Sequence, residues 1–169
     1  MNTIHKAAEL LGLNISQAMG DQETRILEGL VRNGPEITSS TLRVTHLPPR
    51  VRLLDKIREG FPVGAVQHIV DSGRLNLSEV DQVVLPRKTL ANRRKVGALT
   101  ADQSDRLLRV ARVIAAAEEV FGNAEKAHVW LRRPTTALDG EPPLDLLDTE
   151  EGAREVETLL TRIAHGIAA

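Results

Sequence analysis

The chain has 169 residues, enough for one domain or two small ones, with 41% hydrophobic residues and a formal net charge of −1. Aromatic residues make up only 2%, so the core must be built from Leu, Val, Ile and Ala, which is typical of packed helices. The absence of cysteine excludes disulfides, thiol catalysis and thiolate metal sites, and it favours the cytoplasm. No segment has the ~18 apolar residues of a membrane span, and the N-terminus does not have the pattern of a signal peptide.

Residues 1–49 predict a helical extension followed by a loop. Apolar residues at helical spacing predict a first helix from Ile4 onward, which Gly12 and Asn14 break or end. A second helix is expected over 21–32. Residues 37–49 are rich in Ser and Thr and end in two prolines, which is typical of a loop.

Residues 50–98 are expected to form a helix-turn-helix region that binds DNA. Asn76 and Glu79 have the spacing of a capping box, in which two side chains bond backbone N–H groups at the start of a helix. Pro86 suits the first turn of the next helix, where its missing N–H costs little. Two helices separated by a short break are the layout of a helix-turn-helix unit, and the second of this pair carries positive charge. The expected helices cover 50–59, 62–71, 76–84 and the basic segment after Pro86.

Residues 99–169 are expected to form a second helical domain. Thr100 and Gln103 form another capping box, which opens a long helix over about 103–121. Shorter helices are expected over 123–132 and after Thr149, and since no strand pattern is found, the predicted fold class is all-α. A helical turn is expected at 144–147, and the apolar stripe of the long helix consists of Leu107, Val110, Ala111, Ile114, Ala117 and Phe121.

The segment from Arg87 to Lys95 concentrates positive charge in a chain that is nearly neutral, which indicates a polyanion as its partner. Arg and Asn side chains can contact guanine and adenine edges with two hydrogen bonds, and Lys suits phosphates. The alternative is a solvated cationic face on an ordinary surface helix, which the helix-turn-helix context disfavours. The cations are Arg87, Lys88, Arg93, Arg94 and Lys95; Arg87, Lys88, Asn92 and Lys95 have the spacing of one outward face, with Leu90 inward.

Negative charge gathers at the other end of the chain, where eight acidic residues between Asp139 and Glu157 accompany a single basic one, Arg154. DNA would repel this end, so we expect it to face a protein. The alternative is that these side chains cap helices and solubilise a loop. The acidic residues are Asp139, Glu141, Asp145, Asp148, Glu150, Glu151, Glu155 and Glu157.

The sequence contains no pattern of catalytic residues. It has no Gly-rich phosphate loop and no G-x-S-x-G motif. The five histidines, at positions 5, 46, 68, 128 and 165, form neither an i,i+4 pair nor an HExxH motif. We therefore expect a protein that is not an enzyme and that needs neither a metal nor a cofactor.

Five spaced motifs occur in order over about residues 60–166. They are TLxxRRK at Thr89–Lys95, LTxxQSDRLxR at Leu99–Arg109, FGxAEKAxxWL at Phe121–Leu131, ALDGxPLDLLxTxxGAxxV at Ala137–Val156 and LLxRIxxG at Leu159–Gly166. The series closely resembles the Xre/MbcA/ParS family of bacterial antitoxins. One departure is EPP at 141–143, where the family pattern has a variable residue and one Pro. The first fifty or so residues match no family that we can name.

The resemblance implies an Xre-like helix-turn-helix domain followed by a helical toxin-binding domain. It implies a cognate RES-domain toxin that depletes NAD, operator DNA in the protein's own promoter, which it represses, and a homodimer within a larger toxin–antitoxin assembly. In the family the last helix and tail obstruct the toxin's active site. The implied DNA-binding residues are Arg87, Lys88, Thr89, Asn92, Arg93, Arg94 and Lys95, and the implied toxin-binding residues are Arg162, His165, Gly166, Ile167, Ala168 and Ala169.

A small uncharged tail such as GIAA can enter a pocket with little desolvation cost, which agrees with an obstructing role. Two other functions stay open from the residues alone. One is a stand-alone transcription regulator whose C-terminal domain only dimerises. The other is an enzyme that uses one of the scattered His or acidic residues. An adjacent RES-type reading frame favours the antitoxin, and an assay of the purified chain alone tests the enzyme.

Overall fold

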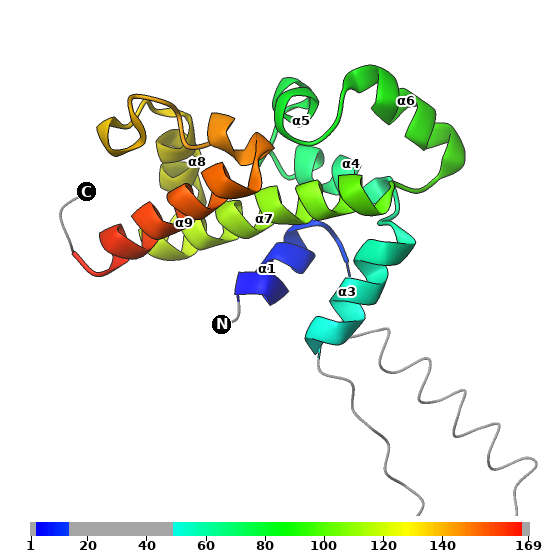
Figure 1. Cartoon of the computed structure of the whole chain (residues 1–169), viewed down its shortest axis with the longest axis horizontal. Helices are drawn as coiled ribbons and strands as arrows, with labels where there is room; N and C mark the ends of the chain where they lie inside the picture. Colours follow the sequence, from blue (N-terminus) through cyan, green and yellow to red (C-terminus); the bar gives the residue numbers. More distant parts are fainter. Residues whose placement is uncertain (1–2, 14–48, 167–169) are drawn as a thin grey trace, which may run out of the picture.

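The computed structural model describes residues 3–13 and 49–166, and within these ranges every regular element is a helix (Figure 1). The all-α prediction is confirmed, whereas the helix expected over 21–32 and most of the loop expected over 37–49 lie outside the described residues. No helix in the described ranges is long and apolar enough to span a bilayer. The elements are α1 Thr3–Leu10, α3 Pro49–Glu59, α4 Gly64–Asp71, α5 Leu77–Val83, α6 Arg87–Val96, α7 Ala101–Phe121, α8 Ala124–Arg132, η1 Thr136–Leu138, η2 Asp145–Asp148 and α9 Glu150–Ala164.

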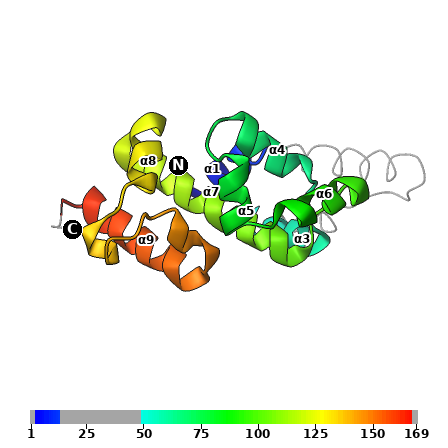
Figure 2. The ribbon, with the colours of Figure 1, turned by 90° about the horizontal axis from the view of Figure 1, so that it is seen from above.

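Helix α7 lies along the long axis of the molecule, and the other elements pack around it. It contacts α1, α3, α8, α9 and η2, and Figure 2 shows α8 and α9 on opposite sides of one half of it. The predicted apolar stripe is buried except for Phe121, which is half-buried and packs on Trp130 with ring centroids 5.4 Å apart. Because neighbours lie on several sides, burial extends beyond that stripe to Val113 and Ala115.

Local sequence signals determine where several helices begin. The Asn76 side chain accepts the N–H of Glu79 at 2.9 Å, and the Glu79 carboxylate accepts the N–H of Asn76 at 2.8 Å. Thr100 and Gln103 exchange the same two bonds at 3.2 and 3.0 Å, so both capping boxes are confirmed. The Asn123 side chain accepts the N–H of Lys126 at 2.9 Å and so caps α8 at the start of the helix expected over 123–132.

The segment before α4 pairs with the segment before α7, and because of this pairing α4 begins later than the sequence predicts. The sequence predicts a helix from Pro62, but α4 begins at Gly64, because the carbonyl of Phe61 accepts the N–H of Leu99 at 2.8 Å. The N–H of Phe61 donates to the hydroxyl of Ser104, also at 2.8 Å, and Ser104 is fully buried. The serine of the LTxxQSDRLxR motif therefore satisfies a buried backbone donor.

Helix α1 belongs to the same folded body as the C-terminal part of the chain. It packs against α7 with Ala7 buried, and Gly12, with φ of 65°, turns the chain after the helix, as expected. Lys6 lies 3.5 Å and Arg74 lies 2.8 Å from the carboxylate of Glu118, whose side chain is only 7% exposed. A carboxylate buried to this degree needs such partners, so this cluster joins α1, the α4–α5 connection and α7.

Candidate functional site

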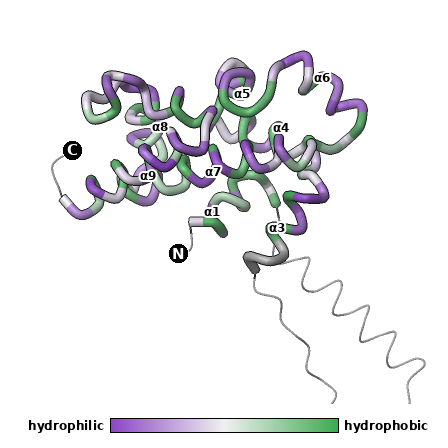
Figure 3. Tube along the Cα trace, in the orientation of Figure 1, coloured by the Kyte–Doolittle hydropathy of each residue, from purple (hydrophilic) through white to green (hydrophobic). Residues whose placement is uncertain are grey.

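Helix α6 forms one end of the molecule and carries the predicted DNA-binding residues (Figures 1 and 3). Leu90 is 4% exposed and packs into the core, while most of the helix surface is hydrophilic. At about 100° per residue, Lys88, Asn92 and Lys95 lie within about 40° of the direction opposite Leu90. All three are exposed, so α6 presents two cations and an amide on its outermost face. Arg87, which the sequence predicts on the same face, lies instead on a flank, about 60° from the direction of Leu90.

The remaining predicted residues of α6 lie on its flanks or partly inside. Arg87 and Arg94 are exposed, whereas Thr89 and Arg93 are half-buried. Arg94 donates to the side-chain oxygen of Gln67 on α4 at 3.3 Å. The structure thus places all seven predicted residues on one helix, but it separates an outer face from two flanking arginines.

Two polar side chains of the neighbouring helices hold these flanking arginines. The Arg87 backbone N–H donates to Oδ1 of Asp81 on α5 at 2.7 Å, and its Nε lies 3.8 Å from Oδ2 of the same residue. Gln67, which accepts from Arg94, donates its own amide to Asp71 at 2.7 Å. By contrast, the side chains of Lys88 and Lys95 form no ion pair with any described residue, which leaves them available to phosphates.

The second predicted site lies at the C-terminal end of α9. Arg162 and His165 are exposed, and Nδ1 of His165 lies 2.7 Å from the carbonyl oxygen of Thr161. Gly166 ends the helix with φ of 65°. His165 also lines a groove of about 860 Å³ between α7 and α9 that reaches Thr3 of α1. Ile167, Ala168 and Ala169 lie outside the described residues.

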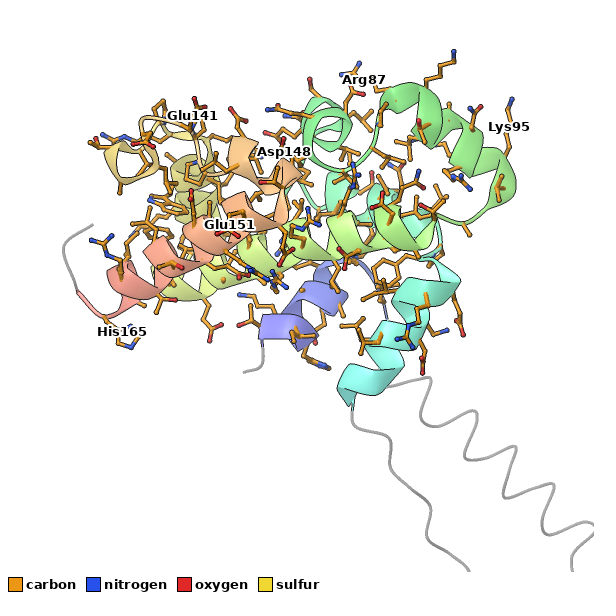
Figure 4. The ribbon with its side chains drawn as sticks, viewed as in Figure 1. Arg87, Lys95, Glu141, Asp148, Glu151 and His165 are labelled. Atoms are coloured by element: carbon orange, nitrogen blue, oxygen red, sulfur yellow. The ribbon has the colours of Figure 1, made fainter. Side chains whose placement is uncertain are left out.

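The acidic segment divides into structural and exposed residues. Asp145 accepts from Gln82 of α5 at 3.0 Å, Glu150 accepts from Arg109 at 2.9 Å, and Glu157 accepts from Arg112 at 2.6 Å. These three carboxylates join η2 and α9 to α5 and α7, which agrees with the structural alternative for them. The side chains labelled Glu141, Asp148 and Glu151 in Figure 4 are exposed and lie away from α6.

The two predicted sites lie at opposite ends of the long axis. Figure 4 shows Lys95 at one end and His165 at the other, with Arg87 further inward at the start of α6. The exposed acidic side chains labelled Glu141, Asp148 and Glu151 lie between these positions, on other elements than the basic helix α6.

Sequence patterns missed an ion pair that joins α8 to α5. Arg132 at the end of α8 donates to both carboxylate oxygens of Glu79 on α5, at 2.7 and 2.8 Å. Glu79 is at the same time the capping residue of α5. The capping spacing predicts only the local role, because no pattern relates residues 53 positions apart. In the described residues, no cluster of His, Asp or Glu side chains has the arrangement of a metal site.

Comparison with known proteins assigns the two ends to two domains. Residues 52–112 match the antitoxin Xre-like helix-turn-helix domain, and residues 116–166 match the antitoxin Xre/MbcA/ParS C-terminal toxin-binding domain. The expected boundary at 98/99 precedes α7, whereas the two matches meet within α7.

Three curated relatives cover different shares of the chain. An Antitoxin Xre of Pseudomonas putida is 36% identical over 126 residues, which are 74% of this chain and 79% of the relative. An Antitoxin Xre of Yersinia enterocolitica is 35% identical over 118 residues, 68% of this chain and 80% of the relative. A Prs ADP-ribosylating antitoxin of a Sphingobium species is 35% identical over 77 residues, 40% of this chain and 48% of the relative.

Proposed function

Because the chain belongs to the family of Xre antitoxins, we propose that it binds and blocks the active site of a cognate RES-domain toxin that depletes NAD. We propose further that its helix-turn-helix domain binds the promoter of its own operon and represses it. The observation that carries both proposals is the presence, in one chain, of a helix-turn-helix domain with an exposed basic helix and a toxin-binding domain at the opposite end.

The exposed face of α6 supports a role in operator binding. In a helix-turn-helix unit the second helix enters the major groove, and here that helix is α6. Asn92 can bond an adenine edge, and Lys88 and Lys95 can contact phosphates. The proposed DNA-binding residues remain Arg87, Lys88, Thr89, Asn92, Arg93, Arg94 and Lys95.

The end of α9 supports a role in blocking the toxin. The helix ends at Ala164 with Arg162 and His165 exposed, and the residues after Gly166, which are Ile167, Ala168 and Ala169, have no charged side chain. Such a segment can fill an active site by shape alone, since it carries no side-chain charge that must lose water. The proposed toxin-binding residues are Arg162, His165, Gly166, Ile167, Ala168 and Ala169.

We propose that the protein represses its operator as a homodimer. We propose also that it does so in the cytoplasm. A two-fold dimer places two α6 helices in successive major grooves, about 34–36 Å apart, which a palindromic operator would match. Sedimentation of the purified protein with and without toxin measures this state. A strictly monomeric protein in both samples would contradict it.

The test of the leading proposal is NAD consumption by the product of the neighbouring gene. Stoichiometric addition of this protein is expected to stop NAD loss, and a variant that lacks Gly166–Ala169 is expected not to do so. A Lys88→Ala, Asn92→Ala double variant is the matched control, since its changes lie at the far end and should leave inhibition intact. Full inhibition by the truncated chain would show that the tail is not the blocking segment.

Two other candidates give different results in the same assay. The match to the Sphingobium relative favours a toxin that transfers ADP-ribose to a protein, and labelled NAD would then leave label on that protein. A stand-alone regulator with a dimerising C-terminal domain would bind the promoter and leave NAD loss unchanged.

A further inference from the structure

We propose that Asp81 of α5 is a positioning residue for sequence recognition by α6: it holds the end of the helix that contacts bases, so that it determines discrimination between DNA sequences. The inference rests on the proposed DNA-binding function. It concerns a carboxylate beside the basic helix α6, where a negative charge opposes the approach of phosphates.

The start of α6 depends on Asp81 because the helix has no cap of its own. The residue before the helix is Pro86, whose side chain offers no acceptor and makes no capping bond. The first N–H of the helix belongs to Arg87, and it donates to Oδ1 of Asp81 at 2.7 Å. An ionised carboxylate at the positive end of a helix accepts a short, strong bond. Asp81 therefore does for α6 what Asn76 does for α5, but from the neighbouring helix.

This bond fixes α6 at the end where orientation matters most. Leu90, in the middle of the helix, is buried and holds it against the core, which leaves the tilt of the N-terminal turn to be set by other contacts. In helix-turn-helix proteins the N-terminal residues of the second helix contact base edges. A bond between α5 and the first residue of α6 thus sets the angle at which Lys88 and Asn92 meet the groove.

The same carboxylate also directs the side chain of Arg87. Its Oδ2 lies 3.8 Å from Nε of Arg87, and the two side chains are 43% and 63% exposed. An ion pair this exposed adds little stability, so its effect is to orient the side chain of Arg87. On the opposite flank Arg94 is held by Gln67, which Asp71 holds in turn. Side chains of α4 and α5 thus position both flanking arginines.

If Asp81 has this role, removing its carboxylate should change two quantities in opposite directions: the sequence-independent affinity for DNA and the discrimination between sequences. Removing the carboxylate removes a repulsive charge, so binding to a duplex of shuffled sequence, which depends on charge alone, should hold steady or strengthen. Removing the bond lets the N-terminal turn move, so binding to the correct sequence should weaken. A capping bond of about 1 kcal/mol corresponds to about fivefold in an equilibrium constant, which is the expected loss of discrimination.

The experiment compares full-length variants by fluorescence anisotropy on two duplexes at several salt concentrations. One duplex covers the promoter upstream of the protein's own gene, and the other has the same bases in shuffled order. Asp81→Ala is expected to lower the ratio of the two affinities about fivefold or more. Asp81→Asn keeps an acceptor oxygen and removes the charge, so it should keep the ratio and strengthen binding to both duplexes.

Two further variants separate positioning from charge and from folding. Asp55→Ala on α3 removes one negative charge from the same domain without touching α6, and it should leave the ratio unchanged. Asp81→Glu keeps the charge but displaces the acceptor by one methylene, so it should also lower the ratio of the two affinities. This variant tests the positioning role even if Asp81→Ala does not fold. A ratio that is unchanged in both Asp81→Ala and Asp81→Glu overturns the positioning role. If the unaltered protein binds the promoter duplex and the shuffled duplex equally well, the proposed binding to its own promoter is overturned, and this inference with it.

Discussion

Replacing Arg132 with Ala is expected to destabilise the protein by about 2–4 kcal/mol. Its guanidinium donates two charge-assisted bonds to Glu79, and the two side chains are only 24% and 13% exposed. Removing one partner of a buried ion pair costs about 3–5 kcal/mol, and the partial exposure of this pair lowers the expectation. Further bonds to the carbonyls of Arg74 and His128, at 3.1 and 2.9 Å, are lost as well.

The measurement is urea unfolding followed by far-UV circular dichroism, with the free energy of unfolding extrapolated to water. Arg154→Ala is the matched control: its side chain is 66% exposed and lies 3.6 and 3.8 Å from its carboxylate partners. Exposed pairs of this kind contribute about 0–1 kcal/mol, so the control should unfold almost as the unaltered protein does.

A double-mutant cycle with Glu79→Gln isolates the ion pair from the helix cap. Glutamine can still accept the N–H of Asn76, so this change removes the charge while it keeps the capping box. We expect a coupling energy of about 1–3 kcal/mol between Arg132 and Glu79. A loss below about 1 kcal/mol in Arg132→Ala, or a coupling close to zero, would refute the reasoning that burial makes this pair strong.

Three other outcomes follow from the structure. Lys95→Ala should reduce the slope of log K against log salt for promoter binding by about 1, because it removes one phosphate contact; an unchanged slope would contradict this. Gly152→Ala should cost about 1–3 kcal/mol in thermal unfolding, since its Cβ would lie 2.1 Å from the Leu146 carbonyl, whereas Gly64→Ala meets no atom and should not destabilise. Deleting residues 166–169 should abolish toxin inhibition and leave promoter affinity unchanged, and parallel loss of both would contradict separate sites.

Much of the fold could be predicted from neighbours in the chain. Capping boxes at Asn76 and Thr100 depend on residues three positions apart, and the stripe of α7 depends on a period of 3.6, so each is visible in the sequence. The concentration of positive charge on α6 and of negative charge after Asp139 is likewise a property of the sequence. The sequence therefore predicted that these basic residues share one helix, although it did not predict their division into an outer face and two flanking arginines.

The sequence by itself determined the helices, their caps and the segregation of charge, because these depend on contacts within one or two turns. Only the tertiary structure decided which side chains meet across the fold. The bond from Asp81 to Arg87, the ion pair of Arg132 with Glu79 and the close approach of Gly152 to η2 join different elements. Such contacts leave no periodic signal in the sequence. Their partners are brought together by the packing of helices around α7, and their spacing in the chain follows no local rule.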